Sequence, residues 1–119
     1  MATTERRPYH HGNLRRELLD AAAAAIEEGG PAALSLRNLA QRAGVSHAAP
    51  AHHFGDRAGL LTALAAEGYQ RLADALEAAG AGGDFLEAGL AYVRFATTHP
   101  AHFLVMFEPS LYRAGDPGV

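Results

Sequence analysis

The chain of 119 residues contains no cysteine and no lysine, and its apolar runs are too short to cross a bilayer. Without cysteine it can form neither disulfides nor zinc–thiolate sites, and without either residue it lacks the thiolate and amine nucleophiles of covalent catalysis. Arg6, Arg7 and Pro8 precede polar residues, so we expect no secretory signal peptide. These absences favour a soluble, cytoplasmic protein that has no contact with a membrane.

Charge is unevenly distributed along the chain, whose formal net charge is −3. Residues 1–57 hold seven arginines and five histidines against six acidic residues, whereas residues 58–119 hold three arginines against seven acidic residues. The first part could therefore approach phosphate groups, and the second could not. The alanine runs and the absence of lysine are typical of a GC-rich bacterial genome.

The apolar periodicity predicts helices throughout. Leu14, Leu18, Ala22 and Ile26 recur every four residues, which predicts an amphipathic helix over 14–28 that ends at Gly-Gly-Pro. Residues 1–12 are polar and contain proline and glycine, so we expect a flexible arm there. Asn13 is a suitable N-cap for this first helix. No segment shows the alternation of a strand, which makes the expected fold class all-α with about six helices.

Residues 35–54 read as two short helices, over 36–42 and 47–53, joined by a tight turn. Ser35 and Ser46 are suitable N-caps, and Gly44 can adopt the positive φ that a sharp exit from the first helix requires. Pro50 would be the fourth residue of the second helix, where it removes a backbone donor. This arrangement is typical of a DNA-binding helix-turn-helix, whose second helix lies in the major groove.

Three further helices follow. A long one is expected over 57–79 after Asp56, with a length of roughly 34 Å at about 1.5 Å per residue. Asp84-Phe85-Leu86-Glu87 resembles a capping box and predicts a helix that continues to about Thr98. Pro100 can start the last helix, which Pro109 ends. We expect a loop at 79–83 and a loose end at 113–119.

The turn Gly44-Val45-Ser46, followed by Phe54, Arg57 and Leu60-Leu61, resembles the TetR family of transcriptional regulators over about residues 9–61. The opening Tyr9-His10-His11-Gly12-Asn13-Leu14-Arg15 is also similar to many members. Residues 91–96 and 99–107 resemble the subgroup named for a Trp-His-Gly motif. Two positions depart from the family pattern, because Ala51 stands where a tyrosine is usual and Arg57 stands where a lysine is common.

The resemblance implies a three-helix DNA-binding domain at 13–57, followed at 58–119 by the long connecting helix and part of an effector-binding and dimerisation domain. It implies a ligand-responsive repressor that binds a palindromic operator in double-stranded DNA as a homodimer, with an unknown small-molecule effector and no cofactor. Members usually have about nine helices, the last two of which form the dimer. We therefore expect a truncated member, whose dimerisation depends on the presence of those helices.

We expect DNA contacts from the second helix of the motif and from residues at helix starts. The candidates are Ser35, Arg37, Ser46, His47, Ala48, Ala49, His52, His53 and Arg57. An imidazole can donate to a guanine edge or a phosphate, alanine can contact a thymine methyl group, and helix starts suit phosphate oxygens. The alternative is that the histidines and alanines form only the exposed face of a short helix and that the serines are only caps. Arg42 is expected to be solvated.

Apolar side chains of the last two helices could line an effector pocket or form an ordinary core. The candidates are Phe85, Tyr92, Phe95, Phe103, Met106 and Phe107. Neighbouring histidines on a helix point about 100° apart, and Pro100 separates His99 from His102 without an acidic residue to complete a set, so we expect no metal site.

An enzyme is not expected, since the chain offers no phosphate-binding loop and no serine in a strand-to-helix turn. The alternative function is that of a remnant without DNA binding, which associates with a full-length relative through its apolar helices. Whether the isolated chain dimerises would distinguish the two.

Overall fold

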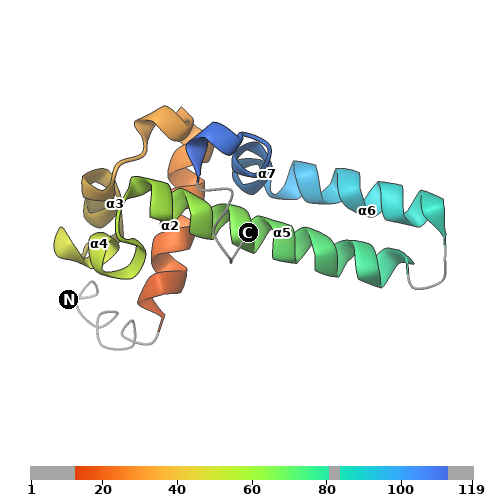
Figure 1. Ribbon diagram of the computed structural model, residues 1–119, viewed down its shortest axis with the longest axis horizontal. Helices are drawn as coiled ribbons and strands as arrows, with labels where there is room; N and C mark the ends of the chain where they lie inside the picture. Colours follow the sequence, from red (N-terminus) through yellow and green to blue (C-terminus); the bar gives the residue numbers. More distant parts are fainter. Residues whose placement is uncertain (1–12, 81–83, 113–119) are drawn as a thin grey trace, which may run out of the picture. The chain divides into compact units, whose positions relative to one another are not determined.

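The computed structural model describes residues 13–80 and 84–112, and within these ranges every regular element is helical, which confirms the all-α class (Figure 1). The chain divides into two compact units, residues 1–57 and 58–119. The predicted arm at 1–12, residues 81–83 of the predicted loop and the predicted loose end at 113–119 lie outside the described residues. Ala79 and Gly80, which were predicted as part of that loop, are helical instead. No helix in the described part of the chain is long and apolar enough to span a membrane.

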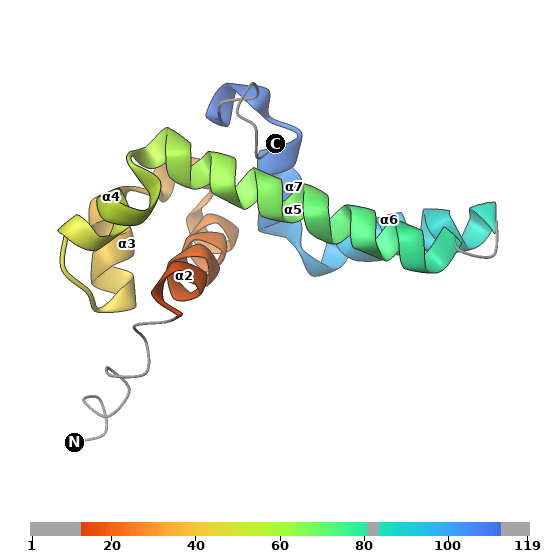
Figure 2. The ribbon, with the colours of Figure 1, turned by 60° about the horizontal axis from the view of Figure 1, so that its bottom comes forward.

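The first unit consists of α2 (Leu14–Gly29), the 3₁₀ turn η2 (Pro31–Ala33), α3 (Leu36–Ala43) and α4 (Ala48–Phe54). Figure 2 shows α3 and α4 joined by a short turn, with α2 beside them. The observed helices begin and end within about one residue of the predicted ones. The buried apolar residues of this unit come mainly from α2 and α3: Leu18, Leu19, Ala22, Ile26, Leu34, Leu39 and Ala40.

The turn between α3 and α4 is held by local hydrogen bonds. The Ser35 side chain accepts a hydrogen bond from the backbone N–H of Asn38 at 3.0 Å, which confirms it as the N-cap of α3. Gly44 adopts φ 72°, as predicted, and the Val45 N–H donates to the Ala40 carbonyl at 3.0 Å. These bonds satisfy groups at both ends of α3 and fix where the chain enters α4.

Neither α4 nor α2 has the side-chain cap that was predicted for it. His47, not Ser46, is the N-cap residue of α4 and makes no side-chain cap bond, while the Ser46 carbonyl accepts from the Ala49 N–H at 3.1 Å. Asn13 stands at the N-cap of α2 but likewise makes no side-chain cap bond. Because α4 begins at Ala48, Pro50 is its third residue, where a helix has no use for the missing N–H. The buried Pro50 ring therefore adds packing without the predicted cost.

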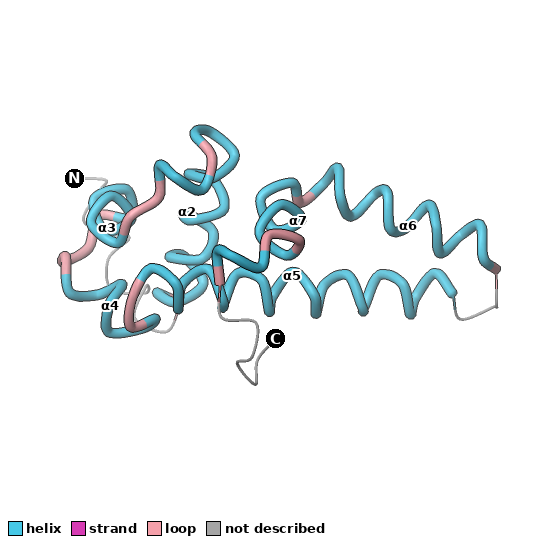
Figure 3. The backbone as a smooth tube through the Cα atoms, turned by 45° about the horizontal axis from the view of Figure 1, so that its top comes forward, coloured by secondary structure: helices cyan, strands magenta, loops and turns pink. Residues whose placement is uncertain are grey.

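The second unit contains α5 (Arg57–Gly80, of which Arg57 belongs to the first unit), α6 (Phe85–Thr98), α7 (Pro100–Met106) and the 3₁₀ turn η3 (Pro109–Leu111). Helices α5 and α6 lie side by side and run antiparallel (Figures 1 and 3). The Asp84 carboxylate accepts from the N–H groups of Leu86 and Glu87 at 3.0 and 3.3 Å, which confirms it as the N-cap of α6.

The core of the second unit joins all three of its α-helices. Leu72, Phe95 and Met106 are buried together, and Tyr69, Leu76 and Phe103 pack against them. The approach of α5 to α7 is close at Gly68, where a Cβ atom would lie 2.6 Å from the Met106 Sδ atom. The Met106 carbonyl accepts hydrogen bonds from both the Tyr69 and the Tyr112 hydroxyls at 3.0 Å, which ties the end of α7 to α5 and to η3.

Candidate nucleic-acid interface and effector groove

The predicted base-contacting residues are His47, which precedes α4, and four residues of α4 itself. His47, Ala48 and His52 are exposed, whereas Ala49 and His53 are half-buried. The His52 and His53 rings meet edge to face with centroids 5.5 Å apart. This surface therefore presents imidazole groups beside small alanines, which is a combination able to donate hydrogen bonds while allowing close approach of the backbone.

The predicted phosphate-contacting residues near α3 are in different environments. Ser35 is half-buried and its hydroxyl accepts the capping bond of α3, so its phosphate role remains a prediction. Arg37 is exposed, and its guanidinium makes no hydrogen bond or ion pair with any residue that the structure describes. Ser46 is exposed on the turn. Arg37 is consequently the cation of α3 that is available to a phosphate.

Arg57 has a structural role that the sequence analysis missed. Its Nε atom donates to the Leu34 carbonyl at 2.8 Å, and its Nη2 atom donates to the Pro31 carbonyl. Both acceptors are backbone groups of the segment that connects α2 to α3. No sequence pattern signals such a pairing, because any residue can supply a carbonyl. A guanidinium has five N–H groups, so the remaining ones could still contact a phosphate.

Two other arginines of the first unit also have partners. The Arg15 guanidinium lies over the Phe54 ring, with Cζ 4.8 Å from the centroid, which is a cation–π contact between α2 and α4. Arg42 is exposed, as expected, and also pairs with Glu28. The hydrogen bond and charge of Arg42 lower the pKa of the Glu28 carboxyl, and the hydrogen bond to Glu28 raises the pKa of Arg42. Arg42 is therefore less available to DNA than Arg37.

The six predicted pocket residues lie in different environments in the part of the chain that the structure describes. Phe95 and Met106 are buried in the core of the second unit, with Phe103 packed against them. The Phe103 ring contacts those of Tyr92 and Phe107 at centroid distances of 5.9 and 4.9 Å. Phe85 is 90% exposed at the start of α6 and takes no part in these ring contacts. Most of this set thus forms core or surface.

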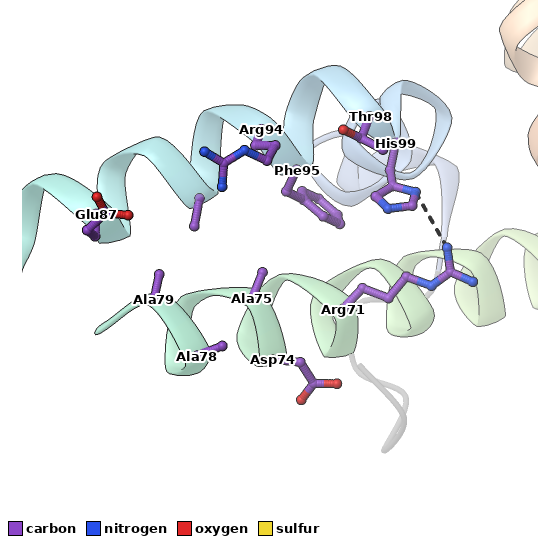
Figure 4. Close-up of a pocket in the computed structure, with 11 residues that line it drawn as sticks. Arg71, Asp74, Ala75, Ala78, Ala79, Glu87, Arg94, Phe95, Thr98 and His99 are labelled. Carbon is purple, nitrogen blue, oxygen red and sulfur yellow. Dashed lines mark hydrogen bonds between the residues drawn. The ribbon is translucent and has the colours of Figure 1, made fainter. Parts of the chain in front are cut away.

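A groove of about 720 Å³ lies between α5 and α6, and Phe95 is the one predicted pocket residue that lines it (Figure 4). The groove is lined by Arg71, Asp74, Ala75, Ala78, Ala79, Glu87, Ala91, Arg94, Phe95, Thr98 and His99. The other ten lining residues were not predicted, because the prediction rested on large apolar side chains. The available signal was the alanine spacing on the predicted long helix, which leaves one side of that helix without bulky side chains.

Glu67, Arg71, His99 and His102 form a polar cluster, and two of them, Arg71 and His99, also line the groove. His102 Nε2 and Glu67 Oε1 are 2.8 Å apart, and His102 is only 4% exposed. Arg71 donates to Glu67 at 3.3 Å, and its Nη1 atom lies 3.5 Å from His99 Nδ1, the contact dashed in Figure 4. Helix α5 thus supplies an acidic residue, Glu67, beside His102. Even so, no group of three or more metal-binding side chains occurs among the described residues.

The fold of the first unit and the exposed face of α4 define a helix-turn-helix domain. Residues 18–64 match the family described as "Bacterial regulatory proteins, tetR family". Residues 18–64 thus form a regulatory domain of the TetR type.

Two solved structures resemble the chain in both sequence and fold. A protein of unknown function from Rhodococcus sp. RHA1 is 43% identical with a TM-score of 0.77, over 94% of this chain and 61% of the other. A protein described as "putative regulatory protein SCO4313" is 33% identical with a TM-score of 0.73, over 85% of this chain and 50% of the other. The chain thus spans about half to three fifths of the length of these relatives. A search of curated proteins found no significant match.

Proposed function

We propose that this protein is a sequence-specific DNA-binding transcriptional regulator, a TetR-type repressor whose DNA binding responds to a small molecule. The observation that carries the proposal is the exposed face of α4, with His47, Ala48 and His52 at the surface of a domain that matches the TetR family. The proposed partners are a double-stranded DNA operator, an effector and a second copy of the protein.

In this proposal α4 enters the major groove and its small side chains allow a close approach to the bases. His52 donates to an acceptor on a guanine edge, and Ala48 contacts a thymine methyl group. The exposed Arg37 and the N-terminal end of α3 lie near the phosphates and set the register of the domain. With few hydrogen-bond donors on α4, part of the specificity comes from the shape of the DNA.

A dimer would place two copies of α4 in successive major grooves, about 34–36 Å apart, and would read a palindromic site. The effector would act in the second unit, and it can release the operator only through its different affinity for the DNA-competent and incompetent states.

The test is a binding selection on randomised duplex DNA at two salt concentrations with the full chain. We expect a palindromic site, bound less tightly at high salt because phosphate contacts release counterions. His52→Ala should relax the preference at one or two base pairs, whereas Thr97→Ala, an exposed change in the second unit, should leave the recovered site unchanged. Salt-sensitive binding without a recovered site would contradict sequence-specific regulation.

The alternative function, association with a full-length relative without DNA binding, is favoured by one observation. Phe85, Leu86 and Val93 on α6 are 90%, 67% and 57% exposed, which is unusual for side chains of this size. A chain that recovers no site, yet associates with a longer relative through α6, would support this alternative.

A further inference from the structure

We propose that the groove between α5 and α6 binds a flat, apolar molecule that carries a carboxylate, such as an aromatic carboxylic acid. The inference deepens the proposed function, on which it rests for the role of effector, because it names the chemical class of the ligand. The binding itself depends only on the second unit and is measured without DNA.

The shape of the groove favours a flat apolar ligand. Ala75 and Ala79 of α5 point toward α6, which contributes Phe95 on the other side of the groove (Figure 4), and Ala78 and Ala91 also line it. The small alanine side chains leave a space of about 720 Å³, which lies within the range of roughly 300–1,000 Å³ that is usual for small-molecule sites. Phe95 is 4% exposed and held by the core, so the small part of its side chain that borders the groove is fixed in place.

The charges along the groove favour an anion at the Arg94 end. Arg94 is exposed, and its guanidinium makes no hydrogen bond or ion pair with residues 13–80 or 84–112. Arg71 differs, because it pairs with Glu67 at 3.3 Å and so has part of its charge balanced. Thr98, four residues after Arg94 on α6, also lines the groove.

The two acidic residues that line the groove do not oppose this assignment. The Asp74 carboxylate accepts a hydrogen bond from Gln70 at 3.0 Å and points away from α6 in Figure 4. Glu87 precedes Arg94 by seven residues on α6, which is about 10.5 Å along the helix axis. A carboxylate held by Arg94 would therefore be separated from Asp74, and Glu87 forms no ion pair with Arg94 in the described part of the chain.

The experiment measures calorimetric binding of three probes that share one ring system and differ in charge. The probes are 1-naphthoate, neutral 1-naphthamide and cationic 1-naphthylmethylammonium. With the full chain we expect 1-naphthoate to bind about tenfold more tightly than the amide, since a hydrogen bond between two charged groups contributes more than a neutral one. The cationic probe should bind most weakly. Equal affinities, or a preference for the cation, would overturn the proposal.

Two variants and their matched controls locate the site. Arg94→Gln should reduce 1-naphthoate affinity by about tenfold and leave 1-naphthamide affinity unchanged, whereas Arg37→Gln, an exposed arginine of the first unit, should change neither. Ala75→Leu should abolish binding of all probes by filling the groove, whereas Ala73→Leu, an exposed alanine on α5 outside the groove, should not. Unchanged binding in Arg94→Gln and Ala75→Leu would contradict the site.

The result is separable from that of the DNA selection. A chain that selects an operator but binds none of the three probes would overturn this inference and leave the proposed function intact. A chain that binds 1-naphthoate through Arg94 but selects no DNA would support the site and contradict the proposed function.

Discussion

Arg57 is the residue whose role the structure changes most. Its family position implies a phosphate contact, yet two of its N–H groups donate to the carbonyls of Leu34 and Pro31. A charged donor to two backbone carbonyls stabilises the segment before α3 regardless of DNA. The side chain at the start of α5 thus stabilises the fold of the first unit with two of its N–H groups.

Replacing Arg57 should therefore lower stability as well as DNA affinity. We expect Arg57→Ala to reduce the free energy of unfolding by about 1–3 kcal/mol, because it leaves two carbonyls without their charged donor. Arg37→Ala removes an exposed arginine without a described partner and should change stability by no more than about 0.5 kcal/mol. Urea unfolding followed by circular dichroism measures both. Equal stability of the two variants would show that the Arg57 bonds contribute nothing.

Because of Tyr112, the stability of the second unit should decrease at alkaline pH. Burial, and then the interaction with Tyr69, raise the pKa of Tyr112 above its ordinary value, so the folded state holds this proton more tightly than the unfolded chain does. The stabilisation is full below the unfolded pKa of about 10 and is lost as pH rises through the folded pKa. We expect the melting temperature to fall more between pH 9 and 11.5 in the wild type than in Tyr112→Phe. Parallel curves for the two proteins would rule this contribution out.

At the scale of elements, the contact of α5 with α7 depends on Gly68. A Cβ atom there would lie 2.6 Å from Met106 Sδ and 3.2 Å from His102 Cβ, so an added methyl group must displace the Met106 side chain. His102 is in turn bound to Glu67, the neighbour of Gly68, which restricts how far α7 can shift. The glycine thus allows the close packing that places the His102–Glu67 pair.

Two glycine substitutions test this point against helix propensity. Gly89 lies within α6, and a Cβ atom there would meet nothing within 4 Å. Gly89→Ala should therefore raise the free energy of unfolding by up to about 1 kcal/mol, which is the propensity difference between the two residues. Gly68→Ala should not gain this amount and should be destabilising by about 1–3 kcal/mol through overpacking. Similar gains from both changes, measured by urea unfolding, would contradict the packing argument.

What the sequence could predict follows from the range of the interactions involved. The apolar spacing on α2, the Ser35 and Asp84 caps and the φ of Gly44 are local, and they were predicted within a residue or two. The groove could not be predicted in the same way, because alanines 75 and 91 belong to helices whose register against each other is set by packing. The carbonyl partners of Arg57 lie 23 and 26 residues away and carry no sequence signal.

At the scale of the whole molecule, the two parts of the chain differ in charge as the proposed roles require. Residues 1–57 are close to neutral and carry seven of the ten arginines, whereas residues 58–119 are acidic. An acidic second part discourages nonspecific wrapping of DNA, so binding should depend on the few contacts of the first part. In the proposed function, affinity for the operator would therefore come from two copies that bind together.

The exposed apolar face of α6 should make the chain self-associate. Leu86, Leu90 and Val93 recur at helical spacing and are 67%, 44% and 57% exposed. Burying such side chains lowers the free energy by about 25 cal/mol per Å² of apolar area. A second copy of the chain presents the same apolar face and could bury it. We expect a concentration-dependent dimer in sedimentation velocity. Val93→Asp should shift it toward monomer, and Ala73→Asp, on the exposed side of α5, should not.

Ala73→Asp serves as the control for added charge, because both variants add one negative charge to the second unit but only Val93→Asp changes the apolar face of α6. If the two behave alike, general repulsion and not the α6 face governs association. If the wild-type chain is monomeric at every concentration, the exposed side chains of α6 do not form a contact between copies. A dimer lost only in Val93→Asp would instead identify α6 as the contact, and the spacing of the recovered operator half-sites would then report the distance between the two copies of α4.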